Sequence, residues 1–131
     1  MDINTPNAEL LHKMRELIKL MNVQLRHFPN HERYALSQEI RQAAYGCYGG
    51  IVRCIKRYHN KTALNELDLQ HEQLRMLVNL GFELGYYDYK DGKRAHTEQE
   101  ALRRYTALSI LINEVGAMIG GWLRSLRAAS G

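Results

Sequence analysis

Apolar residues recur at alternating intervals of three and four along four long stretches of the chain. That spacing places them on one face of an α-helix, and no segment alternates apolar and polar residues as a half-buried strand does. The pattern predicts helices over residues 7–27, 31–60, 63–87 and 97–127. Because the connections between them are short, we expect an all-α fold: a single antiparallel up-down-up-down four-helix bundle, forming one domain over residues 1–131.

Signals at the predicted helix starts agree with this division of the chain. Pro6 stands at the first position of the first helix, where its missing N–H has no helical partner to lose. Asn30 is predicted to cap the second helix and Thr62 the third. Thr97, followed three residues later by Glu100, has the capping-box pattern, in which each side chain accepts from a free backbone N–H.

The last predicted helix carries an apolar stripe that partner helices must cover. The stripe consists of Tyr105, Leu108, Ile112, Val115, Ile119, Trp122 and Leu126. Two arginines, Arg103 and Arg104, precede its apolar run, and Glu114 interrupts it. Arg124 and Arg127 close the run before 18 apolar residues accumulate, so a membrane span is not expected.

The second predicted helix has two apolar stripes. Its core stripe consists of Leu36, Ile40, Ala43, Cys47, Ile51, Cys54 and Tyr58. The other stripe, about a third of a turn away, consists of Tyr45, Tyr48, Val52 and Ile55. A helix in a lone bundle needs only one buried face, so the second stripe predicts an interface with another subunit. Alternatively, its tyrosines border the core with their hydroxyl groups in water.

Small residues add two expectations about packing. Cys47 and Cys54 lie two helical turns apart, roughly 10 Å, which is too far for a disulfide, so both are expected in the core as free thiols. Three glycine pairs, at positions 46 and 50, 81 and 85, and 116 and 120, have four-residue spacing. Inside soluble helices such pairs predict close helix packing rather than a ligand cleft.

Charge is divided unevenly along the chain, whose net charge is +4. Residues 1–61 carry ten basic and five acidic side chains, 62–89 carry one and five, and 90–131 carry seven and four. This division predicts one positive and one negative face, and a positive face favours an anionic partner. Solvated helix faces that keep the protein soluble are the alternative explanation.

Two basic clusters are the candidate nucleic-acid-binding residues. Arg15, Lys19 and Arg26 share one face of the first helix, and Arg53, Lys56 and Arg57 gather near the end of the second. Such side chains neutralise phosphates and make binding salt-dependent. Because the sequence has no zinc finger or RNP-type aromatic signature, any binding is expected to tolerate many nucleic-acid sequences.

Candidate catalytic chemistry is sparse. The six histidines are scattered, with no H-E-x-x-H motif and no Glu-x-x-His motif on an inward helix face, where such bundles hold metal ions. No Gly-rich loop follows a strand, and the acids are spread over faces expected to be exposed. We expect no enzymatic activity, no metal and no cofactor, although a bundle that binds a small molecule or a metal stays an alternative. No targeting motif is recognisable, so the expected location is the cytoplasm.

Two stretches of the sequence resemble a known family. They are residues 28–41, FPNHERYALSQEIR, and residues 111–126, with the core Glu-Val-Gly-x-x-Ile-Gly-Gly-Trp. They are similar to the four-helix-bundle proteins that include the ribosomal-RNA intervening-sequence proteins and the accessory variability determinant (Avd) proteins of diversity-generating retroelements. The similarity covers essentially the whole chain, and the ending Ile119-Gly120-Gly121-Trp122-Leu123 favours the Avd branch.

Resemblance to Avd implies a ring-shaped homopentamer with a basic surface. It also implies a non-catalytic role: binding the retroelement's reverse transcriptase and its template RNA, and possibly cDNA, in support of mutagenic cDNA synthesis. The intervening-sequence branch implies instead an oligomeric bundle with a structural or undefined role.

Overall fold

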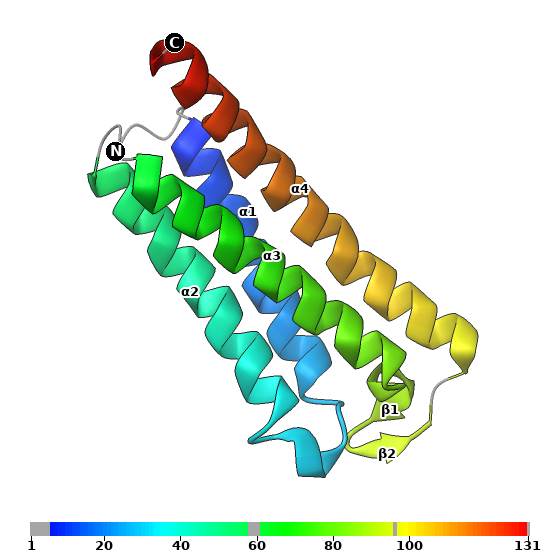
Figure 1. The fold of residues 1–131 in the computed structure, drawn as a ribbon. Helices are drawn as coiled ribbons and strands as arrows, with labels where there is room; N and C mark the ends of the chain where they lie inside the picture. Colours follow the sequence, from blue (N-terminus) through cyan, green and yellow to red (C-terminus); the bar gives the residue numbers. More distant parts are fainter. Residues whose placement is uncertain (1–5, 58–60, 96, 131) are drawn as a thin grey trace.

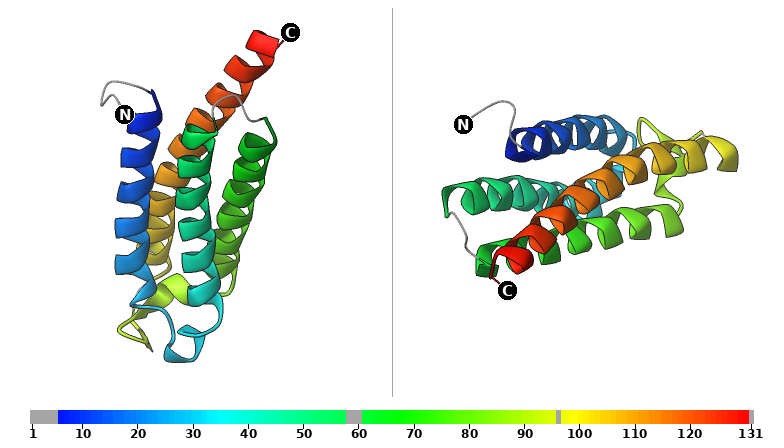
Figure 2. Two further views of the ribbon diagram at one scale, coloured as in Figure 1. Left: turned by 90° about the vertical axis from the view of Figure 1, so that its left-hand side faces the viewer. Right: turned by 90° about the horizontal axis from the view of Figure 1, so that it is seen from above.

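The computed structural model describes residues 6–57, 61–95 and 97–130. Its four long helices alternate in direction along the bundle, as Figure 1 shows, and this confirms the expected all-α bundle. They are α1 (Pro6–Leu25), α2 (Leu36–Lys56), α3 (Lys61–Glu83) and α4 (Glu98–Ser130). Helix α1 packs against α2 and α4, and α3 packs against the same two helices, so α1 and α3 lie diagonally across the bundle. Helix α4 crosses its neighbours obliquely (Figure 2).

The core follows from the predicted apolar stripes. Each helix buries its stripe against the other three, and the removal of one Leu or Ile side chain from water contributes about 1.5–3 kcal/mol. The most completely buried side chains include Met14, Leu17, Met21, Ile40, Ile51, Leu64, Leu67, Leu74, Leu108 and Ile112. Within α2 one detail differs: Ala44 is fully buried, whereas the predicted Ala43 is only partly covered. The predicted core residue Tyr58 lies outside the described residues.

The second helix is shorter than predicted because its first residues fold separately. Residues Asn30–Glu32 form a 3-10 turn, η1, and α2 begins only at Leu36. The prediction that Asn30 caps α2 is wrong. Glu32 takes that role: its Oε2 accepts the N–H of Leu36 at 3.0 Å, while the hydroxyl group of Tyr86 donates to Oε1 at 2.7 Å.

The third helix also ends earlier than residue 87. Gly85 has φ = 78°, the left-handed conformation that commonly terminates helices, so it is not part of a helical glycine pair. A second 3-10 turn, η2 (Tyr86–Asp88), follows. At the start of α3 the predicted Thr62 cap is wrong, because the helix already begins at Lys61.

A short hairpin between α3 and α4 was not predicted. Strands β1 (Tyr89–Lys90) and β2 (Lys93–Arg94) pair antiparallel around Asp91 and Gly92, which both have positive φ. An Asp-Gly pair is a strong turn signal, but two-residue strands are too short to show alternation. The predicted cap of α4 is confirmed: the N–H of Glu100 donates to Thr97 Oγ1 at 3.2 Å.

Close packing between helices occurs at only some of the predicted glycines. A Cβ added to Gly116 would lie 2.7 Å from His71 Cε1, and one added to Gly50 would lie 2.7 Å from Gln70 Oε1. The cysteines behave as predicted: Cys47 and Cys54 are buried free thiols, and burial raises the pKa of Cys47 to about 12.

Helix α4 is more apolar than its charged residues suggested. An 18-residue window within Glu98–Ala128 has a mean hydropathy of 1.3, so by length and composition α4 could cross a membrane, contrary to the sequence-based expectation. In this fold the apolar stripe of α4 packs into the core of the bundle instead. Leu108, Ile112 and Val115 are at most 1% exposed and belong to the shared core.

Candidate nucleic-acid interface

The six predicted basic residues all lie on the outside of the bundle. Arg15 and Lys19 are exposed on α1, Arg26 is exposed in the turn directly after it, and Arg53 and Lys56 are exposed on α2. The remaining residue, Arg57, is exposed directly after α2. Helices α1 and α2 are antiparallel neighbours, so the two clusters lie on adjacent helices of the bundle.

The two clusters are not merged into a single patch. On α2, Arg41 and Tyr45 face α1, since both bond to Asn22: the Nε of Arg41 donates to Asn22 Oδ1 at 3.1 Å. Arg53 lies eight residues after Tyr45, about 80° further around the helix. It therefore points away from the α1 contact, towards the next face of the bundle. Lys56 lies eleven residues after Tyr45, only about 20° around the helix, so it is on the same side as Tyr45 and the α2 cluster spans both faces.

Most of these cations have no acidic partner among the described residues. The exception is Lys19, whose Nζ lies 3.5 Å from Glu16 Oε1. An exposed ion pair of this kind is worth only about 0–1 kcal/mol, so Lys19 is readily available to a phosphate.

The opposite corner of the bundle is acidic. Glu66, Asp68, Glu72 and Glu83 are all exposed on α3, as the sequence predicted. Glu72 is partly neutralised by Arg75, whose hydrogen bond lowers the pKa of Glu72. Since α3 lies diagonally across from α1, the molecule has a basic side and an acidic side.

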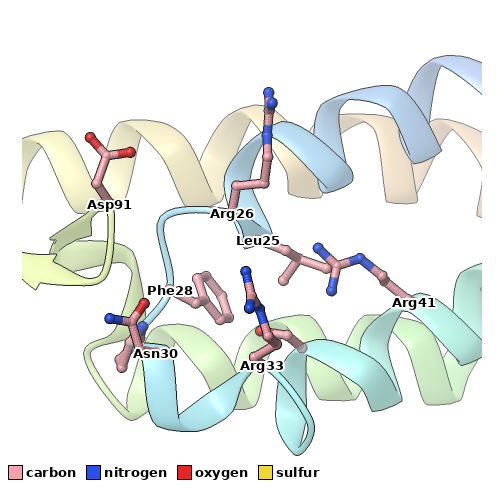
Figure 3. A pocket seen from close by; sticks show the side chains of 9 residues that line it. Leu25, Arg26, Phe28, Asn30, Arg33, Arg41 and Asp91 are labelled. Atoms are coloured by element: carbon pink, nitrogen blue, oxygen red, sulfur yellow. The ribbon is translucent and has the colours of Figure 1, made fainter.

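A pocket with three arginines lies at one end of the basic side. It has a volume of about 320 Å³ and is formed by the end of α1, the connection through η1 and the start of α2. Arg26, Arg33 and Arg41 line it, and Figure 3 shows Arg33 and Arg41 extending towards each other while Arg26 points outward. Sequence analysis missed Arg33 and Arg41 because it placed both in one continuous helix from residue 31. The available signal was the spacing of seven residues from Arg26 to Arg33, across the break at Pro29, and of eight from Arg33 to Arg41.

The loop around this pocket is held by several specific contacts. The N–H of Asp91 donates to His27 Nδ1 at 3.1 Å, and the N–H of Gly92 donates to the His27 carbonyl at 3.2 Å. On the other side, the hydrogen bonds that Glu32 accepts from Leu36 and then from Tyr86 hold the pKa of its carboxyl below its usual range. The hairpin and η1 are therefore fixed against the ends of α1 and α2.

The predicted interface stripe on α2 is divided by the fold. Tyr45 and Val52 are exposed, whereas Tyr48 and Ile55 are partly buried against the core. Further exposed apolar side chains, which the sequence did not indicate as an interface, lie on α3, directly after it and on α4. They are Leu69, Met76, Leu80, Leu84, Leu102 and Ile110.

No group of three or more His, Cys, Asp or Glu side chains able to hold a metal ion occurs within the described part of the chain.

The fold and the charge distribution together define a class of protein: a four-helix bundle with one basic and one acidic side. The family model described as bAvd-like matches residues 10–126, and the chain belongs to this family, that of Avd proteins. Membership associates it with diversity-generating retroelements, in an accessory role. No curated protein shows a significant match to the sequence.

Proposed function

We propose that this protein is a non-catalytic accessory subunit of a diversity-generating retroelement. It acts in the cytoplasm, where it binds the reverse transcriptase and the template RNA, or the cDNA copied from it, and so supports mutagenic cDNA synthesis. The observation that carries the proposal is the set of exposed cations on α1 and α2, in a chain that belongs to the bAvd-like family.

The basic side suits the sugar-phosphate backbone better than a particular base sequence. Arg15 and Lys19 are exposed along α1, and Arg53 and Lys56 are exposed along α2. Exposed cations spread in this way neutralise phosphates without reading base edges, and each neutralised phosphate steepens the salt dependence of binding. We therefore expect affinity for structured RNA with little sequence preference.

Assembly into a homopentamer would strengthen this binding. A single chain carries +4, and a ring of five copies carries five times that charge, enough for a strong field. A closed ring joins two different surfaces of each copy, head to tail. Exposed apolar residues such as Tyr45 and Val52 on α2, and Met76 on α3, supply surface for such contacts.

Charge reversal on α2 tests the proposal. We expect Arg53→Glu combined with Lys56→Glu to weaken binding to a structured RNA by at least about tenfold at physiological salt, because four units of charge change on the proposed surface. The measurement is fluorescence anisotropy with labelled RNA.

The matched control reverses the same amount of charge elsewhere, with Arg103→Glu and Arg124→Glu on α4, which are also exposed. Light scattering on both variants establishes that the assembly is unchanged. Equal losses in the two double variants would show that only net charge matters, and unchanged RNA affinity in the α2 variant would remove Arg53 and Lys56 from the interface.

A further inference from the structure

The pocket lined by Arg26, Arg33 and Arg41, here called the arginine pocket, has a specific arrangement of cations in addition to its positive charge. Its three guanidinium groups come from separate parts of the chain: Arg26 from the turn directly after α1, Arg33 from the connection and Arg41 from α2. Among the described residues none of the three forms an ion pair, and Arg41 has only its Nε occupied, by Asn22. Guanidinium groups are planar forks that match phosphate oxygens in pairs, so such a group of arginines has a chemical preference for phosphate.

Ser37 provides an independent indication of a ligand. It lies in the first turn of α2, lines the pocket and is 1% exposed. Its hydroxyl oxygen has no hydrogen-bond partner in the described structure. A buried hydroxyl group without a partner costs about 1–3 kcal/mol, so such groups usually serve a purpose. A phosphate oxygen in the pocket would accept its hydrogen, and the positive end of the α2 dipole adds to the attraction.

Charge and size narrow the ligand to a phosphate monoester. Among the described residues Asp91 is the only acid that lines the pocket, and its Oδ1 lies 3.2 Å from His27 Nδ1. Three guanidinium groups and one carboxylate leave a local charge near +2, which matches the approximate −1.5 to −2 of a monoester at neutral pH better than the single charge of a diester. The volume of about 320 Å³ lies at the lower end of small-ligand sites, which suffices for a phosphate and its sugar.

The walls of the pocket are consistent with a ligand that is part sugar or base. Phe28 is 3% exposed and forms an apolar wall together with Leu25 (Figure 3). The hairpin is held in place against this end of the bundle, since a Cβ on Gly92 would lie 2.4 Å from Asn30 Oδ1. The site is therefore preformed rather than assembled by large movements, which limits the entropy lost on binding.

We propose that this pocket binds the terminal phosphate of a nucleic-acid strand, or the same phosphate monoester on a free nucleotide. Arg33 and Arg41 hold its oxygens, Arg26 closes the outer side and Ser37 donates from below. The inference rests on the proposed function for its choice of ligand, because it assigns one chemical group of the nucleic acid to one place on the basic side.

The experiment is isothermal titration calorimetry with three short single strands that differ only at their ends: a 5′-phosphate, a 3′-phosphate or hydroxyl groups at both ends. We expect one phosphorylated strand to bind about tenfold more tightly than the strand with two hydroxyl ends. Arg33→Gln with Arg41→Gln should abolish that preference, whereas Arg124→Gln, at the opposite end of the bundle, should retain it.

Two further variants separate a binding role from a structural one. Asp91→Asn removes the acid from the pocket and should increase the preference for the phosphorylated strand severalfold. Ser37→Ala should reduce the preference severalfold while the melting temperature stays equal or rises, because the variant loses a buried hydroxyl group that has no partner in the free protein. A merely structural serine would lower the melting temperature instead. Circular dichroism melting of each variant completes the set.

The possible results distinguish this inference from the proposed function. If strands bind but the phosphorylated ends bring no gain, or the gain survives loss of Arg33 and Arg41, the pocket assignment is wrong while the accessory function stands. If strands do not bind, but AMP and inorganic phosphate bind in a manner that requires Arg33 and Arg41, the site stands with a free nucleotide as its source and the proposed function falls.

Discussion

Arg104 shows how one side chain joins elements that are distant in the sequence. It is partly buried near the start of α4, and burial lowers the pKa of its guanidinium group. Its Nη1 donates to the carbonyl groups of Tyr87 and Tyr89, each at 3.0 Å, and Nη2 donates to that of Gln24 at 3.4 Å. In return, Gln24 Nε2 donates to the Arg104 carbonyl at 2.7 Å. The end of α1, the η2–β1 segment and α4 are thereby connected.

We predict that Arg104→Met lowers the free energy of unfolding by about 2–4 kcal/mol, because it removes charge-assisted bonds and leaves backbone carbonyls without donors. The adjacent Arg103→Met is the control, since Arg103 is exposed and its loss should change stability by less than about 0.5 kcal/mol. Urea denaturation measures both. Equal effects of the two variants would show that the Arg104 bonds contribute nothing to stability.

The residues of the candidate site differ in how readily they could be predicted from the sequence. Arg15, Lys19 and Arg26 were recognisable from helical spacing alone, because a cluster on one face of one helix is a local property. Arg33 and Arg41 were not, because they meet only when the chain turns at Pro29 and η1. Such a meeting depends on the geometry of a connection, which side-chain periodicity does not report.

At the scale of elements, the contact between α3 and α4 depends on a matched pair of residues. His71 is buried on α3, and its Nε2 hydrogen-bonds with the Ile112 carbonyl of α4 at 2.8 Å. The imidazole ring occupies the space that a side chain at position 116 would need. Gly116 therefore allows a polar ring to sit between two helices with its hydrogen bond formed.

Alanine substitutions at the two glycines of the pair 116 and 120 are predicted to change the stability of the fold in opposite directions. In an open helix Gly→Ala stabilises by up to about 1 kcal/mol. Gly120→Ala should do so, because its Cβ would meet only the flexible end of Arg124 at 3.4 Å. Gly116→Ala should instead destabilise by about 1–3 kcal/mol, since the new Cβ would overlap His71. Thermal unfolding measures both variants, and stabilisation by both would contradict the described α3–α4 contact.

Element prediction succeeded where the signal was long and failed where it was short. Four helices with stripes of five or more apolar positions were predictable, as was the cap at Thr97. The break between η1 and α2 was missed because residues 31–35 contain no proline or glycine, and a glutamate, Glu32, performs the capping from outside the helix. The hairpin was missed because its strands are only two residues long.

For the whole molecule, the diagonal arrangement of α1 and α3 is the decisive feature. It keeps the basic and acidic sides apart and leaves apolar residues exposed on α2, α3 and α4. One chain alone has a modest net charge, so the proposed nucleic-acid binding would be strengthened by several copies presenting their basic sides together. The charge asymmetry could be predicted from the sequence. The diagonal placement could not, because it depends on how the helices are ordered in space.

The most direct test of this account is the solution mass of the protein, measured by light scattering alone and with a structured RNA at two salt concentrations. We predict a particle of five subunits that binds the RNA, with an affinity that falls steeply as salt rises because counterions are released from the phosphates. A monomer or dimer that does not bind the RNA at either salt concentration would contradict the account: the bundle would stand, and its proposed function would not.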